Sequence, residues 1–234
     1  MSLQSAASAR SGFAPPLTVS GTPWTATPAP GGPLAAGLAL TGPVLHVLAD
    51  SGIYTEGDEA RLFYKVVSGV VRTCRFLNDG RRQIEAFHVA GDVFGLDVAA
   101  ARRLSAEAVS DCTLIAYRRH GLETLAAADT ALAGQLLSYA LRCVERAQDH
   151  AMLLGRSSAA QKVAIFLLEM ANRMPFGETI DLAMTRQDIA DYLGLTIETV
   201  SRTLSQFERD ALIARPSARR IRLNNRAALR ALGA

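Results

Sequence analysis

The sequence has few cysteines, and they are not grouped. Its 234 residues contain Cys74, Cys112 and Cys143, and no two of these have C-x-x-C spacing. A zinc site, a disulfide framework or an iron–sulfur cluster needs several cysteines at short spacings, so the sequence predicts none of these. Isolated cysteines are typical of a reducing compartment, and we expect a cytoplasmic protein.

Long hydrophobic runs are also absent. Apolar residues make up 49% of the chain, but no stretch approaches the roughly 20 apolar residues that span a bilayer. The first charged side chain is Arg10, and the N-terminus has no unbroken apolar stretch of signal-peptide character. We therefore expect no membrane partner and no export.

Motifs of catalysis are missing as well. The sequence contains no carboxylate pair, nucleophile–base set or phosphate loop of recognisable spacing. Gly91 and Gly95 have G-x-x-x-G spacing, but by itself this is a weak phosphate signature and is typical of a turn between strands. The sequence predicts that the protein is not an enzyme.

Residues 1–42 differ in composition from the rest of the chain. They are dominated by Ala, Ser, Thr, Pro and Gly, and Phe13 and Trp24 are their aromatic residues. A segment so poor in large apolar groups cannot bury enough surface to order itself. We predict a flexible tail.

Residues 43–120 contain short β-prone runs that end at glycines. FYKVVSG, VVRTCRFLNDG and RRQIEAFHVAGD are three of them, and Asn78-Asp79-Gly80 supplies a tight turn between two runs. Several strands at this spacing predict a small antiparallel barrel or roll.

Residues 121–155 change to a helical period without proline, which predicts one long helix. An apolar stripe recurs about every 3.5 residues along it. Because such a helix is longer than a small domain is wide, we predict that the stripe pairs with a second copy of the chain; packing on the roll is the alternative. The predicted dimer interface consists of Leu132, Leu136, Tyr139, Cys143 and Ala147.

Residues 156–234 predict a DNA-binding domain. An amphipathic helix in SSAAQKVAIFLLEMANRM is followed by a short helix at 186–193, a turn at Gly194 and a second helix from Ile197. This is the helix-turn-helix pattern, in which the second helix lies in the major groove of DNA. The next residues, ALIARPSARRIRLNN, predict two short strands around a Pro216-Ser217 turn, which together form a wing.

The second helix has two distinct faces. In TIETVSRTLSQF the apolar residues recur at steps of three and four, and the polar residues repeat the same rhythm one residue out of phase. The polar face carries Glu198, Ser201, Arg202 and Ser205, and carboxylates, hydroxyls and guanidinium groups can read base edges. A solvated helix face has a similar composition, so the flanking charge decides the interpretation.

Positive charge is concentrated at the C-terminal end. The net charge of the chain is only +3, but residues 201–234 contain eight arginines against Glu208 and Asp210. This local excess favours a polyanionic partner, and we expect double-stranded DNA.

The order of these parts resembles the Crp/Fnr family of bacterial transcription regulators over about residues 45–234. VVSGVVRTCRFLNDGRRQIEAFHVAGDVFGL and DYLGLTIETVSRTLSQ are most similar to the FixK branch, whose members activate genes for low-oxygen respiration and nitrogen fixation. The resemblance implies an α+β fold with a cyclic-nucleotide-binding-like β-roll, a dimerisation helix and a winged helix-turn-helix. It also implies a homodimeric activator that works with RNA polymerase.

The family pattern E-x-x-S-R implies a half-site like TTGAT, paired with its inverted copy across four base pairs. By this resemblance Glu198, Ser201 and Arg202 contact bases. Ile197 stands where cAMP-type relatives carry an arginine, so a TGTGA-type half-site is disfavoured. The expected contacts to the DNA backbone are Thr185, Arg186, Thr196, Ser205, Arg219 and Arg220.

The departures from relatives argue against a cofactor. Leu96 replaces the glutamate that holds the ribose in cAMP-binding members, and Arg102-Arg103 lacks the serine of the phosphate-binding pair. We expect both arginines to be exposed. The N-terminal cysteine cluster of Fnr-type oxygen sensors is missing, so no iron–sulfur cluster is expected.

The alternative is the same fold switched by a bound small ligand, by haem or by redox chemistry. The candidate haem ligands are His46, His88, His120 and His150. Cys112 and Cys143 are the candidate redox-sensitive thiols, although a buried cysteine is ordinarily inert.

Overall fold

The computed structural model describes residues 42–156, 158–173 and 179–233. The tail predicted for residues 1–42, with Phe13 and Trp24, therefore lies almost wholly outside the described part. Within the described residues, no helix is long and apolar enough to cross a membrane.

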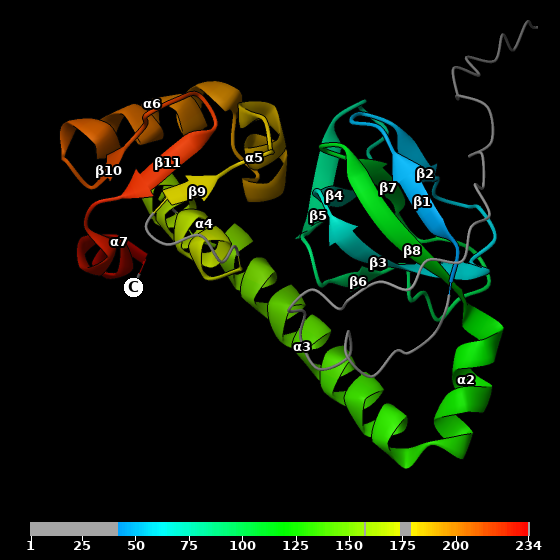
Figure 1. Cartoon of the computed structure of the whole chain (residues 1–234). Coiled ribbons are helices and arrows are strands. Elements are labelled where there is room, and N and C mark those ends of the chain that lie inside the picture. Colours follow the sequence, from blue (N-terminus) through cyan, green and yellow to red (C-terminus); the bar gives the residue numbers. More distant parts are fainter. Residues whose placement is uncertain (1–41, 157, 174–178, 234) are drawn as a thin grey trace, which may run out of the picture.

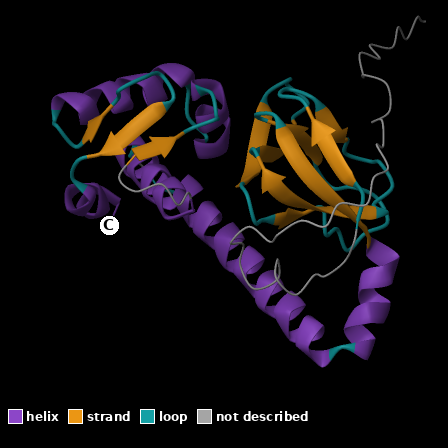
Figure 2. Cartoon of the chain, viewed as in Figure 1, coloured by secondary structure: helices purple, strands orange, loops and turns teal. Residues whose placement is uncertain are grey.

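The N-terminal part is an antiparallel β-roll of two sheets (Figures 1 and 2). One sheet has the order β1 (Val44–Val47), β8 (Cys112–Arg118), β3 (Leu62–Ser68) and β6 (Val93–Phe94). The other has the order β2 (Gly52–Tyr54), β7 (Ser105–Ala108), β4 (Val71–Phe76) and β5 (Arg82–His88). The predicted roll is confirmed, and the face between the sheets is filled by apolar side chains from both.

The predicted hairpin turn joins β4 to β5. Gly80 has a φ of 83°, which is costly for a residue with a Cβ, and the N–H of Leu77 donates to the carbonyl of Arg81 at 2.8 Å. The turn brings Arg82 beside β4, and this arginine becomes important for the contact with the second domain.

The predicted single helix over residues 121–155 is wrong in one respect, because the structure contains two helices. Helix α2 (Arg119–Ala128) ends before Asp129, and α3 (Thr130–Leu154) begins after it. The carboxylate of Asp129 accepts hydrogen bonds from the N–H groups of Ala131 and Leu132 at 2.9 and 3.1 Å. Asp129 thus caps α3 and redirects the chain.

Helix α3 runs from the end of α2, past the roll, to the second domain (Figure 1). Leu132 and Tyr139 are buried against Phe63, Val93 and Tyr117 of the roll, and the Tyr139 hydroxyl donates to the carbonyl of Val93. These two members of the predicted dimer stripe instead follow the alternative, packing on the roll. Leu136 packs partly against the same cluster, whereas Cys143 and Ala147 are exposed.

The C-terminal domain contains the predicted helix-turn-helix and wing. In chain order its elements are α4 (Ala159–Arg173), β9 (Thr179–Asp181), α5 (Arg186–Leu193), α6 (Ile197–Arg209), β10 (Ile213–Ala214), β11 (Arg220–Leu223) and α7 (Arg226–Gly233). Strands β10, β11 and β9 form a small antiparallel sheet. Strand β9 and helix α7 are not anticipated by the sequence patterns.

The two domains share one hydrophobic core. Phe87 of the roll lies 5.2 Å from Tyr192 and 6.3 Å from Phe166, measured between ring centres. The same buried cluster includes Cys74 and Ile84 of the roll. The DNA-binding domain therefore packs directly on the outer face of the β4–β5 sheet.

Candidate nucleic-acid interface

Two capped helices form the helix-turn-helix. Thr185 is the N-cap of α5, and it exchanges hydrogen bonds with Asp188: the Asp188 N–H donates to the Thr185 hydroxyl, and the Thr185 N–H donates to the Asp188 carboxylate. Gly194 ends α5 with a φ of 61°. Thr196 then caps α6, because its hydroxyl accepts from the N–H of Thr199 at 3.2 Å. Local capping thus sets the angle between the helices.

Helix α6 presents its polar face to solvent. Val200, Leu204 and Phe207 are buried on the opposite face, as the sequence predicts. Glu198 and Arg202 are exposed, and Arg202 makes no hydrogen bond or ion pair to any described residue. Because no described residue hydrogen-bonds to this guanidinium, its donors are available to a ligand.

Glu198 is held in its ionised form. A hydrogen bond from its own backbone N–H is the main cause of a lowered pKa, and the Thr196 side chain and the Arg202 charge act in the same direction. An ionised carboxylate can accept from an exocyclic amino group of a base. Ser201 lies half-buried one turn further along the same face and, with Arg202, lines a shallow surface groove.

The wing is tied to the helix-turn-helix by two arginines. Arg215 pairs with Glu208 of α6 at 2.5 Å, and it also approaches the Ser205 hydroxyl at 3.4 Å. Arg186 of α5 donates to the carbonyl of Ala218 in the wing turn at 3.2 Å. Burial, reinforced by the charge of Arg215, lowers the pKa of Arg186. These contacts hold the wing beside α6.

The six predicted backbone contacts therefore have different surroundings. The hydroxyls of Thr185 and Thr196 cap helices, and Arg186 and Ser205 have partners in or beside the wing. Arg220 forms a long, exposed pair with Asp181 at 3.6 Å. Arg219 is exposed at the tip of the wing. The structure brings the whole set to one end of the molecule, around α6 and the wing (Figure 1).

Sequence comparisons place both domains. Residues 44–129 match the cyclic nucleotide-binding domain, and residues 161–232 match the Crp-like helix-turn-helix domain. The nitrogen fixation regulation protein FixK of Azorhizobium caulinodans is 48% identical over 190 residues, which cover 78% of this chain and 76% of that protein. The chain belongs to the Crp/Fnr family.

Two further relatives support this assignment. FixK of Rhizobium meliloti is 39% identical over 82% of this chain and 89% of its own length. The structure of FixK2 from Bradyrhizobium japonicum superposes with a TM-score of 0.80 at 44% identity, covering 83% of this chain and 98% of that one. The chain is thus a FixK-like Crp/Fnr transcription regulator with a DNA-binding helix-turn-helix, and this is a family of regulators, not of enzymes.

The interior of the Crp/Fnr roll is occupied by the chain's own side chains. Arg102 is only 4% exposed, so the expectation that both arginines of the pair are exposed is wrong for Arg102 and right for Arg103. The Arg102 guanidinium donates to the carbonyl of Gly95 at 2.7 Å and pairs with Asp97 at 2.9 Å. Asp97 already neutralises the charge of Arg102, so a bound anion would have to compete with Asp97 for this guanidinium.

Aromatic rings fill the neighbouring space. Tyr54, Tyr64 and Phe94 stack on one another with ring centres 5.3 to 6.2 Å apart, and His88 stacks on Phe94 at 5.1 Å. Burial raises the pKa of Tyr54, although the charge of Arg102 opposes this. The sequence patterns indicate no role for Tyr54, Tyr64 and Phe94, whereas His88 is one of the candidate haem ligands.

The four candidate haem ligands are far from equivalent. His88 is half-buried, and its removal from water lowers its pKa to about 4. His150 stacks on Tyr192 with ring centres 4.1 Å apart, whereas His46 and His120 are exposed. Among the described residues, no group of three or more His, Cys, Asp or Glu side chains is placed to hold a metal ion.

The cysteines also differ. Cys74 and Cys112 are buried; burial, and then the charge of Glu107, raises the pKa of Cys74 to about 11, and burial raises that of Cys112. Both are therefore protonated and unreactive at neutral pH. Cys143 is exposed on α3.

Proposed function

We propose that the chain binds DNA as a homodimer, at an inverted repeat of TTGAT half-sites separated by four base pairs. The observation that carries this proposal is the polar face of α6, on which Glu198 and Arg202 are exposed and Arg202 makes no hydrogen bond or ion pair to a described residue. Arg202 gives bidentate hydrogen bonds to the O6 and N7 of a guanine, Glu198 accepts from a cytosine amino group, and Ser201 touches a thymine.

The proposed contacts to the DNA backbone surround this face. Arg219 and Arg220 of the wing meet phosphates through their charge, and Arg186 does so while holding the wing turn. Because the hydroxyls of Thr185 and Thr196 are used as caps, these two residues act through the helix N-termini, where N–H groups point outward.

The dimer is supported by a second face of α3. Leu137, Leu141 and Val144 are 62%, 60% and 53% exposed, and their spacing of four and then three residues is that of a coiled-coil seam. This face lies opposite Tyr139, which packs on the roll. We therefore assign the dimer seam to these three residues in place of Leu132 and Tyr139. By helical spacing, Ala147 lies next to this seam, whereas Cys143 lies nearer the face that carries Tyr139.

DNA binding in this proposal needs no cyclic nucleotide and no iron–sulfur cluster. Arg102 is held by Asp97 and by Gly95 and Leu62 carbonyls, and Leu96 cannot hold a ribose. Activity then follows the amount of protein made, and oxidation of Cys143 is a route by which it can be modulated.

The biological role is carried over from relatives. The FixK proteins of Azorhizobium caulinodans and Rhizobium meliloti are named for nitrogen fixation regulation. We propose that this chain is an activator of genes for nitrogen fixation or low-oxygen respiration, that it acts with RNA polymerase, and that it works in the cytoplasm, where its DNA is.

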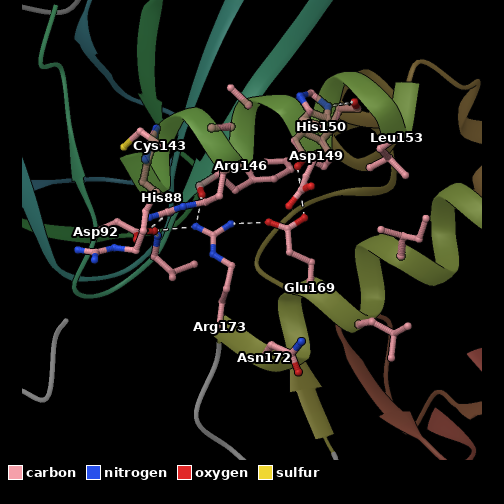
Figure 3. Close-up of a pocket in the computed structure, with 18 of the residues that line it drawn as sticks. His88, Asp92, Cys143, Arg146, Asp149, His150, Leu153, Glu169, Asn172 and Arg173 are labelled. Carbon is pink, nitrogen blue, oxygen red and sulfur yellow. Dashed lines mark hydrogen bonds and ion pairs between the residues drawn. The ribbon is translucent and has the colours of Figure 1, made fainter. Parts of the chain in front are cut away.

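A second candidate is the same regulator switched by a bound small ligand. It is favoured by a cavity of about 930 Å³ between the roll, α3 and the DNA-binding domain. Figure 3 shows Arg173 reaching between Asp92 and Glu169 in this cavity, with Arg146 and His150 above it. The absorption spectrum and the mass of the purified protein discriminate between the two candidates.

The deciding experiment is operator binding by protein freed of metal and ligand. We expect tight, salt-dependent binding to the TTGAT inverted repeat and weaker binding when either half-site is scrambled. Binding only after a ligand or haem is added would favour the second candidate. Equal binding to scrambled DNA at all salt concentrations would reject sequence-specific recognition.

A further inference from the structure

We propose that a buried ion-pair network between the roll and α5 sets the half-site spacing that this regulator accepts. The inference rests on the proposed function, because a spacing is defined only for a dimer that reads two half-sites. The network consists of Arg72, Arg82 and Glu107 from the roll, with Asp188 and Asp191 from α5.

The roll supplies the cations. Arg72 of β4 donates to Asp188 Oδ1 at 3.1 Å, and Arg82 of β5 donates to the same oxygen at 2.5 Å. Arg82 also reaches Asp191 at 2.9 Å. Glu107 of β7 accepts from Arg72 at 2.8 Å and so fixes that guanidinium from behind.

The helix-turn-helix supplies the anions, and Asp188 has two roles. One of its oxygens meets the roll, and the other accepts from the N–H and hydroxyl of Thr185 at 2.9 and 2.7 Å. The same carboxylate therefore starts α5 and joins it to the roll. Any rotation of α5 away from β4 and β5 has to break bonds at the first turn of the helix.

The network is shielded from solvent. The side chains of Asp188, Arg72 and Arg82 are 2%, 10% and 17% exposed. Salt screens such pairs far less than surface pairs, and an unpaired partner left behind would be a buried charge. We therefore expect this network to hold α5 rigidly against the roll, which the exposed ion pairs elsewhere on the roll cannot do.

The position of α5 controls the position of α6. Helix α5 lies between α6 and strands β4 and β5 of the roll (Figure 1). Gly194 and the caps fix α6 relative to α5, while Glu198 and Arg202 stay exposed with the network closed. The network thus orients the reading helix without blocking it.

In a dimer, the orientation of α6 relative to the roll sets the distance between the two reading helices. Each base pair added between half-sites moves the second one by about 3.4 Å along the DNA axis and by roughly 35° around it. A stiff junction between the roll and α5 cannot follow such a change, whereas a loosened junction can. The network therefore discriminates between spacers without contacting DNA.

A separate set of contacts holds the two domains together when the network is removed by substitution. Arg173, at the end of α4, donates to Asp92 at 2.7 Å and to the carbonyl of Phe87 at 2.6 Å. The apolar contacts of Phe87 with Phe166 and Tyr192 also remain. Because Tyr192 is itself on α5, loss of the network should leave the domains in contact and let the helix-turn-helix tilt about these remaining contacts.

The test measures affinity for operators with spacers of three, four, five and six base pairs. The variants are Arg72→Gln with Arg82→Gln, and separately Asp191→Asn, which leaves the α5 cap intact. Arg75→Gln is the control, because Arg75 is on β4 too but pairs with exposed Glu56. Single-base variants of TTGAT and thermal melting are measured in parallel.

We expect the parent and the Arg75→Gln control to prefer the four-base-pair spacer by about tenfold or more, and the network variants to reduce this ratio to about threefold or less. Base preference within TTGAT should be unchanged. An unchanged spacer preference, or an equal loss of affinity for all spacers, would overturn the inference. If the parent chain binds a single half-site as well as the repeat, the proposed dimer itself has failed.

Discussion

The guanidinium of Arg102 lies 4.0 Å from the centre of the Tyr54 ring, inside the roll. The same guanidinium pairs with Asp97 and donates to the carbonyls of Gly95 and Leu62. A buried arginine with this many partners is part of the core, and its neighbour Arg103 is exposed. The two adjacent residues should therefore respond very differently to the same change.

Arg102→Met should lower the free energy of unfolding by about 3 kcal/mol, because it leaves Asp97 and two carbonyls without their partner. Arg103→Met is the matched control and should change stability by less than about 0.5 kcal/mol. Urea unfolding of both variants measures the difference. Equal effects would mean that Arg102 is not the support we describe.

Cyclic AMP should not change operator affinity. By the resemblance to cAMP-binding members, Leu96 replaces the glutamate that holds the ribose, and Arg102 is already paired with Asp97. Titration of cAMP against protein and a labelled operator checks this expectation. A large gain in affinity would show that the roll still binds the nucleotide.

Arg202→Ala should cost about 1–3 kcal/mol on the TTGAT site and flatten the preference for its guanine. Arg219→Ala should instead weaken all sequences alike and reduce the salt slope by about one. Binding to each single-base variant at fixed salt distinguishes the two roles. If Arg202→Ala loses affinity equally for every base at that position, Arg202 contacts a phosphate.

Leu137→Glu combined with Leu141→Glu should convert the proposed dimer to a monomer at micromolar concentration. The introduced carboxylates of one copy would face those of the other copy across the seam, where they would lose solvation and repel one another. Arg142→Glu changes charge on the roll-facing side of α3 and is the control, expected to stay dimeric. Sedimentation gives the answer, and a double variant that remains dimeric would place the interface elsewhere.

Stability should fall in mild acid because of His88. Its pKa is lowered from 6.5 to about 4 by burial; the charge of Asp92 opposes this, and Arg173 and Arg146 reinforce it. The unfolded chain therefore takes up a proton first as pH falls. The contribution is present above pH 6.5 and is lost between pH 6.5 and about 4, amounting to about 3 kcal/mol.

Urea unfolding at several pH values measures this loss. His88→Leu should reduce the slope of unfolding free energy against pH over that range by the equivalent of about one bound proton, whatever its effect on stability at pH 7. His120→Leu changes an exposed histidine and should leave the slope as it is. An unaltered slope in His88→Leu would assign the acid sensitivity to other groups.

The helix-turn-helix could be predicted from the sequence because its determinants are local. Apolar residues at steps of three and four define the buried face of α6, and Gly194 marks the turn. The predicted first helix agrees with α5 at both ends. Glu198 and Arg202 share one face for the same reason, since residues four apart are neighbours on any helix.

Local signals were also missed. Asp129 is a good N-cap residue, but the apolar period continues across it, so periodicity alone predicts one helix where the cap starts a second. Thr185 and Asp188 have the spacing of a capping box, which predicts the start of α5. Nothing local indicates that Asp188 has a second set of partners.

Only the tertiary structure decided which surfaces meet. The bond from Arg72 to Asp188 joins residues 116 positions apart, and the one from Tyr139 to Val93 joins residues 46 apart. Whether Tyr139 or Leu137 faces the roll depends on how α3 is rotated against it, and both choices fit the same helical period. Periodicity determines the faces of a helix, but the packing of distant residues, and the need to pair every buried charge, determines what each face contacts.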